Sequence, residues 1–136
     1  MEGSRGKSIA SWIVQVVTGA HFILASLGKI TSAPAVVQMF EDWGFPDGFH
    51  LLIGALELAG GIGLLRPKTA GYAALGLIGI MIGAAGTHLA NGVPVVRPLV
   101  FMVLLVVVVI LQRPWPLPVV FPEGGQVSHF NTRWRT

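Results

Sequence analysis

One carboxylate lies inside an otherwise apolar stretch of the sequence. Glu57 follows Phe49, the start of an apolar segment, by eight residues. An ionised carboxylate in hydrocarbon costs on the order of 3 kcal/mol even on lenient scales, so such a residue normally faces the interior of a helix bundle beside a polar partner. Glu57 could accept a proton or bind a ligand there. It could equally form a structural hydrogen bond that joins two helices, and the residue type leaves both roles open.

Five further ionisable residues lie within apolar segments or at their ends, and each is a candidate for a ligand or proton site with Glu57. They are His21, Lys29, His50, His88 and Arg97. His21 and Lys29 are the candidates for direct contact with Glu57. Ser11, Gln15 and Thr18 share an arc of roughly 120° with them at 100° per residue, which predicts a polar stripe facing the bundle interior. We interpret His21 as a partner of Glu57.

The other histidines give weaker signals. His50 shares a helical face with Glu57, seven residues away, and is expected at the membrane surface. His88 points away from a seam of glycines and is expected to line another crevice or to face lipid headgroups. Three histidines and one carboxylate could bind a metal ion, but the sequence has no His-x-His or His-x-x-x-His spacing. We therefore predict no metal site.

The elements that must position these residues are apolar helices. The chain is 53% hydrophobic and 11% charged, whereas about a quarter of the residues in soluble domains are charged. Its mean hydropathy is +0.73. A membrane span needs roughly 20 apolar residues, and four apolar segments occur, at residues 8–30, 49–65, 69–90 and 97–112. The sequence predicts an all-α protein: an integral membrane four-helix bundle that forms one membrane domain over residues 1–136.

The connections add two further expectations. Val36, Val37, Phe40 and Trp43 recur at helical spacing, which predicts a short amphipathic helix on the membrane surface between the first two spans. The Pro-rich tail, residues 113–136, is not expected to be helical, and its aromatic residues suggest docking on a partner or on the membrane. We do not interpret residues 8–30 as a signal peptide, because their apolar run is too long. The chain has no cysteine, which excludes disulfides, thiolate nucleophiles and iron–sulfur clusters.

The basic residues indicate an orientation. Seven of the nine flank the predicted spans on one side, and Lys/Arg excess marks cytoplasmic loops; they are Arg5, Lys7, Arg66, Lys68, Arg113, Arg133 and Arg135. We therefore predict a multi-pass protein of a bacterial-type inner (cytoplasmic) membrane with both termini cytoplasmic. Such flanking charges do not suggest nucleic-acid binding. In this topology His21 and Glu57 both lie about 12 Å below the outer surface, at 1.5 Å per residue.

Small residues are expected to let the helices pack closely. One seam is formed by Gly76, Gly79, Gly83, Gly86 and Ala90, and a second set of glycines is formed by Gly54, Gly60, Gly61 and Gly63. Neither set has the context of a phosphate-binding loop. We interpret both as sites of close helix contact.

The segment from Gly19 to Leu111 resembles the DoxX family of small membrane proteins. The matching motifs are Ser26-Leu-Gly-Lys29, Gly44-Phe-Pro46, the run from Gly54 to Gly61 around Glu57, Arg66-Pro67, and Gly86-Thr-His-Leu89. The resemblance implies a four-helix membrane bundle. It also implies association with membrane redox chemistry, since the family is named after a subunit associated with a quinol oxidase and a related branch oxidises thiosulfate with quinone. It assigns no catalytic residue.

Two functional hypotheses follow. The first is a quinone-linked or redox-associated subunit of a larger membrane complex, in which Glu57 and His21 hydrogen-bond a quinone and exchange its protons. The second is a non-catalytic accessory subunit or assembly factor, in which the same residues are structural. Both hypotheses imply a lipid bilayer and partner membrane-protein subunits. Whether the chain is an enzyme stays open.

Overall fold

The computed structural model describes residues 2–112, with side chains from residue 9 onward. The expectations for the tail at residues 113–136, and for the side chains of Arg5 and Lys7, therefore lie outside the described residues. Five helices follow one another: α1 (Glu2–Ile30), α2 (Pro34–Asp42), α3 (Phe49–Leu64), α4 (Ala70–Ala90) and α5 (Val96–Gln112). The predicted all-α class is confirmed for this part of the chain, which contains no strand.

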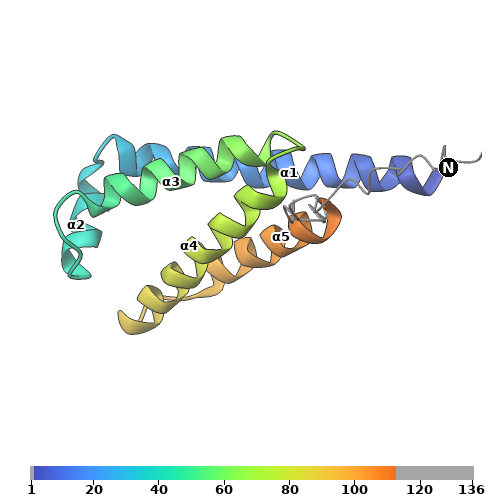
Figure 1. Cartoon of the computed structure of the whole chain (residues 1–136). Helices are drawn as coiled ribbons and strands as arrows, with labels where there is room; N and C mark the ends of the chain where they lie inside the picture. Colours follow the sequence, from blue (N-terminus) through green and yellow to red (C-terminus); the bar gives the residue numbers. More distant parts are fainter. Residues whose placement is uncertain (1, 113–136) are drawn as a thin grey trace, which may run out of the picture.

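The four long helices form two antiparallel pairs, α1 with α3 and α4 with α5 (Figure 1). The pairs meet near the turn between α3 and α4 and spread apart toward α2. We call these two ends the Arg66 end and the α2 end. The start of α1 and the end of α5 both lie at the Arg66 end, as an even number of antiparallel helices requires.

The short helix α2 confirms the amphipathic helix expected between the first two long segments. Pro34 occupies its first turn, where the missing N–H of proline costs no helical hydrogen bond. The turn that follows contains Gly44 and Gly48, with φ of 78° and 80°. Glycine adopts this left-handed conformation without steric cost, so the two glycines permit the chain to reverse into α3.

Two segments have the length and composition of membrane spans. Ile9–Ile30 has a mean hydropathy of 1.5 and Ala70–Ala90 one of 1.7. The helices α3 and α5 are apolar but shorter, at 16 and 17 residues. The expectation that all four helices cross the membrane therefore stays a prediction.

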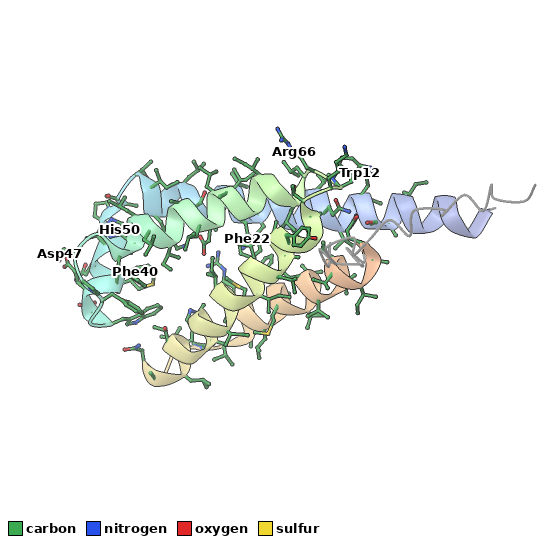
Figure 2. The ribbon with its side chains drawn as sticks, viewed as in Figure 1. Trp12, Phe22, Phe40, Asp47, His50 and Arg66 are labelled. Carbon is green, nitrogen blue, oxygen red and sulfur yellow. The ribbon has the colours of Figure 1, made fainter. Side chains whose placement is uncertain are left out.

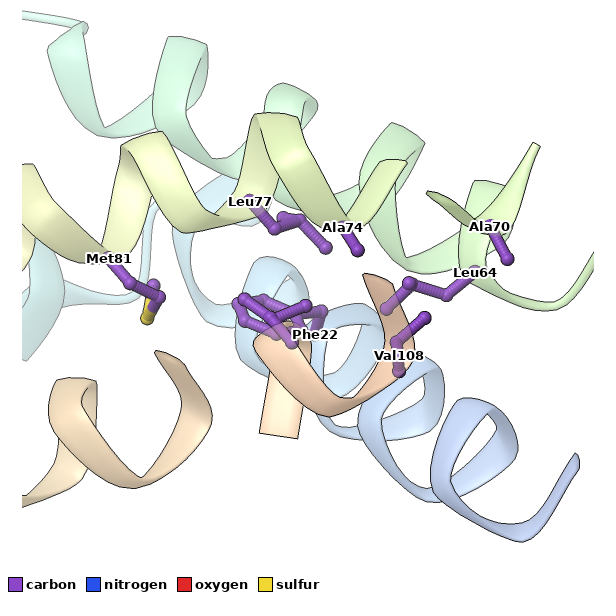
Figure 3. Packing of buried hydrophobic residues seen from close by; sticks show 8 residues of the cluster. Phe22, Leu64, Ala70, Ala74, Leu77, Met81 and Val108 are labelled. Carbon is purple, nitrogen blue, oxygen red and sulfur yellow. The ribbon is translucent and has the colours of Figure 1, made fainter. Parts of the chain in front are cut away.

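The hydrophobic core lies where the two pairs meet, toward the Arg66 end (Figure 3). Every long helix contributes to it. Its buried members are Phe22, Leu64, Ala70, Ala74, Leu77, Met81, Leu105 and Val108. The core therefore holds the bundle together at one end and leaves the α2 end to be organised by polar and aromatic contacts.

The glycines of α3 allow the close packing that was predicted. A Cβ atom added at Gly61 would lie 3.0 Å from the backbone oxygen of Gly19 and 3.1 Å from the backbone nitrogen of Ile23 on α1. A Cβ atom at Gly60 would lie 2.7 Å from Leu77 on α4. These separations are shorter than side chains normally tolerate, so α3 approaches both neighbours more closely than alanine would permit.

The interpretation of the α4 glycines as a packing seam within this chain is wrong. A Cβ atom added at any of them would meet no atom of the described part of the chain within 4 Å; the positions are Gly76, Gly79, Gly83 and Gly86. The helix packs through the residues on its other side, Ala70, Ala74, Leu77 and Met81. Periodicity groups the glycines on one face, but it does not determine which face of α4 meets α3 and α5.

Candidate functional site

Glu57 faces the bundle interior and forms an ion pair with Lys29. The residue is 4% exposed, and the Lys29 Nζ atom donates a 2.9 Å hydrogen bond to Glu57 Oε2. Gly54 makes this approach possible, because a Cβ atom there would lie 2.8 Å from the Cβ of Lys29. Gly54 precedes Glu57 by three residues and so shares its helical face. The predicted contact of Glu57 with His21 or Lys29 is thus confirmed for Lys29.

His21 has a different partner from the one expected. Its ring stacks on Phe101 of α5, with 3.6 Å between centroids and 10° between planes. Phe22 contacts both rings edge-on, at 5.6 Å from His21 and 5.9 Å from Phe101. The side-chain hydrogen bonds of residues 9–112 include none from His21 to Glu57. The residue beside the His21 ring is therefore Phe101, and the expected partnership of His21 with Glu57 is not observed.

Arg97 belongs to the same neighbourhood. The positive charges of Arg97 and Lys29 act on the His21 ring, and the Arg97 side chain is itself exposed. Arg97 precedes Phe101 by four residues on α5, so the two share a helical face. Among the described residues the one ion pair is that of Lys29 with Glu57. His21 and the Arg97 guanidinium are thus left without a charged partner in this part of the chain.

His50 organises the connection around α2 instead of joining Glu57. It is buried, and its Nε2 atom lies 3.0 Å from the Ser32 hydroxyl. Its ring meets Phe40 edge-on at 6.1 Å. Figure 2 shows His50, Phe40 and Asp47 together at the α2 end. A hollow of about 210 Å³ beside them is lined by His50, Phe40 and their neighbours, and it does not include His21 or Glu57.

His88 lies at the end of α4 and makes two contacts there. Its Nδ1 atom donates a 2.9 Å hydrogen bond to the Pro94 carbonyl oxygen, which fixes the turn into α5. Its ring also meets Trp43 edge-on, with 5.4 Å between centroids. This contact joins the residue after α2 to the other helix pair. His88 is thus a link across the α2 end, which its position in the sequence did not predict.

Of the six candidates, the structure pairs Lys29 with Glu57 and stacks His21 on Phe101, one turn of α5 beyond Arg97, and it places His50 and His88 in other contacts. Sequence reasoning missed Phe101, which positions His21, and Gln112, which donates a 2.8 Å hydrogen bond to Ser11. The four-residue spacing between Arg97 and Phe101 was the one sequence feature that could have indicated where Phe101 lies. No group of three metal-binding side chains occurs in residues 9–112.

The arrangement suits hydrogen bonding to a polar group between the half-buried His21 and the exposed Arg97 near the start of α5. Lys29 and Glu57 balance each other's charge, so they do not need a ligand for that purpose. The imidazole of His21 can donate through one nitrogen and accept through the other, and the Arg97 guanidinium can only donate. Phe101 and Phe22 hold the imidazole in place. The set can therefore orient an oxygen-bearing ligand and exchange a proton with it.

Comparison with known proteins gives one match. A family model described as the DoxX-like family matches residues 13–111, well over half of the chain. Neither the curated proteins nor the solved structures include a match.

Proposed function

Because the chain belongs to the DoxX-like family, we propose that it is a quinone-linked, redox-associated subunit of a larger membrane complex. The observation that carries this proposal is the group formed by His21, Lys29, Glu57 and Arg97. These side chains come from α1, α3 and α5: Glu57 is buried and paired with Lys29, His21 is half-buried against Phe101, and Arg97 is exposed near the start of α5. The Lys29–Glu57 pair alone is enough to join α1 to α3. His21 and Arg97 are therefore additional polar groups that this helix contact does not need.

The donors at this site fit the polar head of a quinone. A quinone takes up or releases two electrons and two protons, and its two carbonyl oxygens accept hydrogen bonds. His21 and Arg97 supply N–H donors, and the neutral imidazole can also accept an O–H proton. Phe22 and Phe101 give the site aromatic walls. The apolar helices around it would admit a lipid-soluble ligand from the bilayer. Electrons would pass to or from a partner subunit.

A second candidate function is that of a non-catalytic accessory subunit or assembly factor. The glycine face of α4 favours it, because a Cβ atom added at Gly76, Gly79, Gly83 or Gly86 would meet no atom of the described residues within 4 Å. Glycine faces in membrane helices commonly pack against other helices. The two candidates differ in whether His21 has a ligand.

Quinone retention tests the proposal. We expect wild-type protein, extracted with its native lipids, to copurify with quinone that mass spectrometry detects. The substitution His21→Phe keeps an aromatic ring beside Phe101 and removes both nitrogens. It is expected to lower retention about tenfold, because each 1.4 kcal/mol of lost hydrogen bonding is a factor of ten in affinity.

The matched control is His88→Phe, which removes a histidine outside the group and keeps an aromatic ring against Trp43. It should retain quinone at the wild-type level. Equal retention by the wild type and His21→Phe, or no quinone in the wild type, would favour the accessory role.

We further propose that α1, α3, α4 and α5 all cross the inner membrane, with the Arg66 end cytoplasmic. The location of both described chain ends at that end supports this, as do Arg66 and Lys68 in the turn there and the Lys/Arg excess that the sequence predicts for this side. In intact cells, Lys68→Cys is expected to resist an impermeant thiol reagent added outside. Asp47→Cys, at the α2 end, is expected to react. The native chain has no cysteine to interfere, and the opposite labelling pattern would reverse the orientation.

A further inference from the structure

A line of buried polar side chains runs along α1 from the Arg66 end toward His21. Ser11, Gln15 and Thr18 follow one another at spacings of four and three residues, so they share one helical face. All three are buried, Gln15 to 1% and Thr18 to 0% exposure. At the Arg66 end, the Nε2 atoms of Gln15 and Gln112 donate to the Ser11 hydroxyl at 2.7 and 2.8 Å. The Gln112 contact places the Ser11 end of the line between α1 and α5.

Two atoms on this line have no hydrogen-bond partner in the described part of the chain. They are Gln15 Oε1 and Thr18 Oγ1, and neither is accessible at the surface. Exchanging the oxygen and nitrogen of the Gln15 amide does not remove the problem, because whichever atom faces Ser11 leaves the other without a partner. A buried polar atom without a partner is costly, and proteins commonly satisfy such atoms with ordered water that makes about three hydrogen bonds.

Gln15 and Thr18 lie on successive turns of one face of α1, an arrangement that one water molecule can bridge. Three residues of helix correspond to a rise of about 4.5 Å, and two hydrogen bonds of ordinary length through one oxygen span more than this. Ser26, farther along α1, differs: its hydroxyl donates to the Ile23 carbonyl oxygen at 2.6 Å. Phe22, at 2% exposure, lies between Thr18 and Ser26 and separates the two regions.

We propose that Gln15 and Thr18 bind water between α1 and α5, and that this water forms, with Ser11 and Gln112, a proton path from the Arg66 end to His21. His21 lies three residues beyond Thr18, on the next turn of α1. The distance from Ser11 to His21 along the helix is about 15 Å, half the thickness of a typical hydrocarbon core. Hydroxyl groups and water both donate and accept, so they can relay a proton, whereas the Gln15 amide orients the water.

The path ends at His21, because the Phe22 ring blocks its continuation toward Ser26 and Lys29. The role of the path in proton delivery rests on the proposed function. The presence of water at Gln15 and Thr18 does not. The two claims can therefore fail separately, and separate measurements address them.

Water-edited solid-state NMR of isotope-labelled protein in lipid bilayers tests the water directly. We expect magnetisation from water to reach the Gln15 amide and the Thr18 side chain several-fold faster than it reaches Ser26 or Val108, which serve as buried controls. The substitution Thr18→Val should slow the transfer to Gln15. Transfer to Gln15 and Thr18 as slow as transfer to Val108 would overturn the proposal.

Thermal unfolding gives an independent reading. If the Thr18 hydroxyl holds water, Thr18→Val should lower the melting temperature and Thr18→Ser should not, because serine keeps the hydroxyl. If the hydroxyl is dry and unpaired, valine should raise the melting temperature, which would contradict the water site. Quinone retention by the same variants separates the two claims. Water detected at Thr18 in a protein that retains no quinone would support the water site and would contradict the proposed delivery of protons to His21.

Discussion

Replacing Lys29 by methionine is expected to destabilise the folded protein by about 3–5 kcal/mol, the usual cost of removing one partner from a buried ion pair. Methionine keeps the length and the apolar stem of lysine, so the change acts mainly on charge. Glu57, at 4% exposure, would keep an uncompensated charge inside the bundle. The reciprocal change, Glu57→Gln, should cost less, because Lys29 is more exposed than its partner and its long side chain can reach toward the surface.

The double variant Lys29→Met with Glu57→Gln supplies the control. Removing both charges should recover most of the loss, since no unpaired ion remains. Reversible unfolding of the four proteins in detergent micelles gives the coupling free energy as a double-mutant cycle. Additive losses in the double variant would show that the two residues do not act as a pair.

Gly61→Leu is expected to separate α1 from α3. Even a Cβ atom at this position would lie 2.9 Å from the Ile23 side chain and 3.0 Å from the Gly19 backbone oxygen. Backbone atoms cannot move aside as a side chain can, so the loss of stability should reach or exceed the top of the usual overpacking range of about 1–3 kcal/mol. Loss of folded, monodisperse protein on size-exclusion chromatography, with a lowered melting temperature, is the expected measurement.

Gly79→Leu is the matched control, with the same substitution on α4, where an added Cβ atom would meet no atom of residues 9–112 within 4 Å. We expect it to leave the melting temperature of the isolated protein within a few degrees of the wild type. Equal damage from Gly61→Leu and Gly79→Leu would mean that the α1–α3 contact is not the determinant of stability. Damage from Gly79→Leu confined to the assembled complex would instead support a partner at the glycine face.

The sequence predicted the helices well, because apolar runs ended by Pro, Gly and charged residues leave few alternatives. It also predicted that Glu57 needs an interior partner, since the cost of a lone carboxylate does not depend on fold details. It did not predict the identity of every contact. Depth placed both His21 and Lys29 within reach of Glu57, and only the close approach at Gly54 decides for Lys29.

Sequence reasoning missed the Phe101–His21 contact and the orientation of the α4 glycines for the same reason. Between Arg97 and Gln112 the helix α5 is apolar on all sides, so hydrophobic periodicity could not show that Phe101 faces His21. The glycines of α4 share a face, but no pattern within α4 indicates which neighbour that face meets. In both cases the missing information is the rotation of a helix about its own axis. That rotation is set by contacts among all the helices, which no single segment encodes.

The uneven distribution of contacts between the helix pairs has a mechanical consequence. The buried core joins the pairs toward the Arg66 end, while at the α2 end the Trp43–His88 contact links them. With 21 residues, α4 is about 31 Å long, so a change of roughly 10° in the angle between the pairs would displace its far end by about 5 Å. The same rotation would hardly move the core. The distance between spin labels near Trp43 and His88 would therefore change most with the angle between the pairs. Labels near Ala70 would hardly move and would serve as the reference.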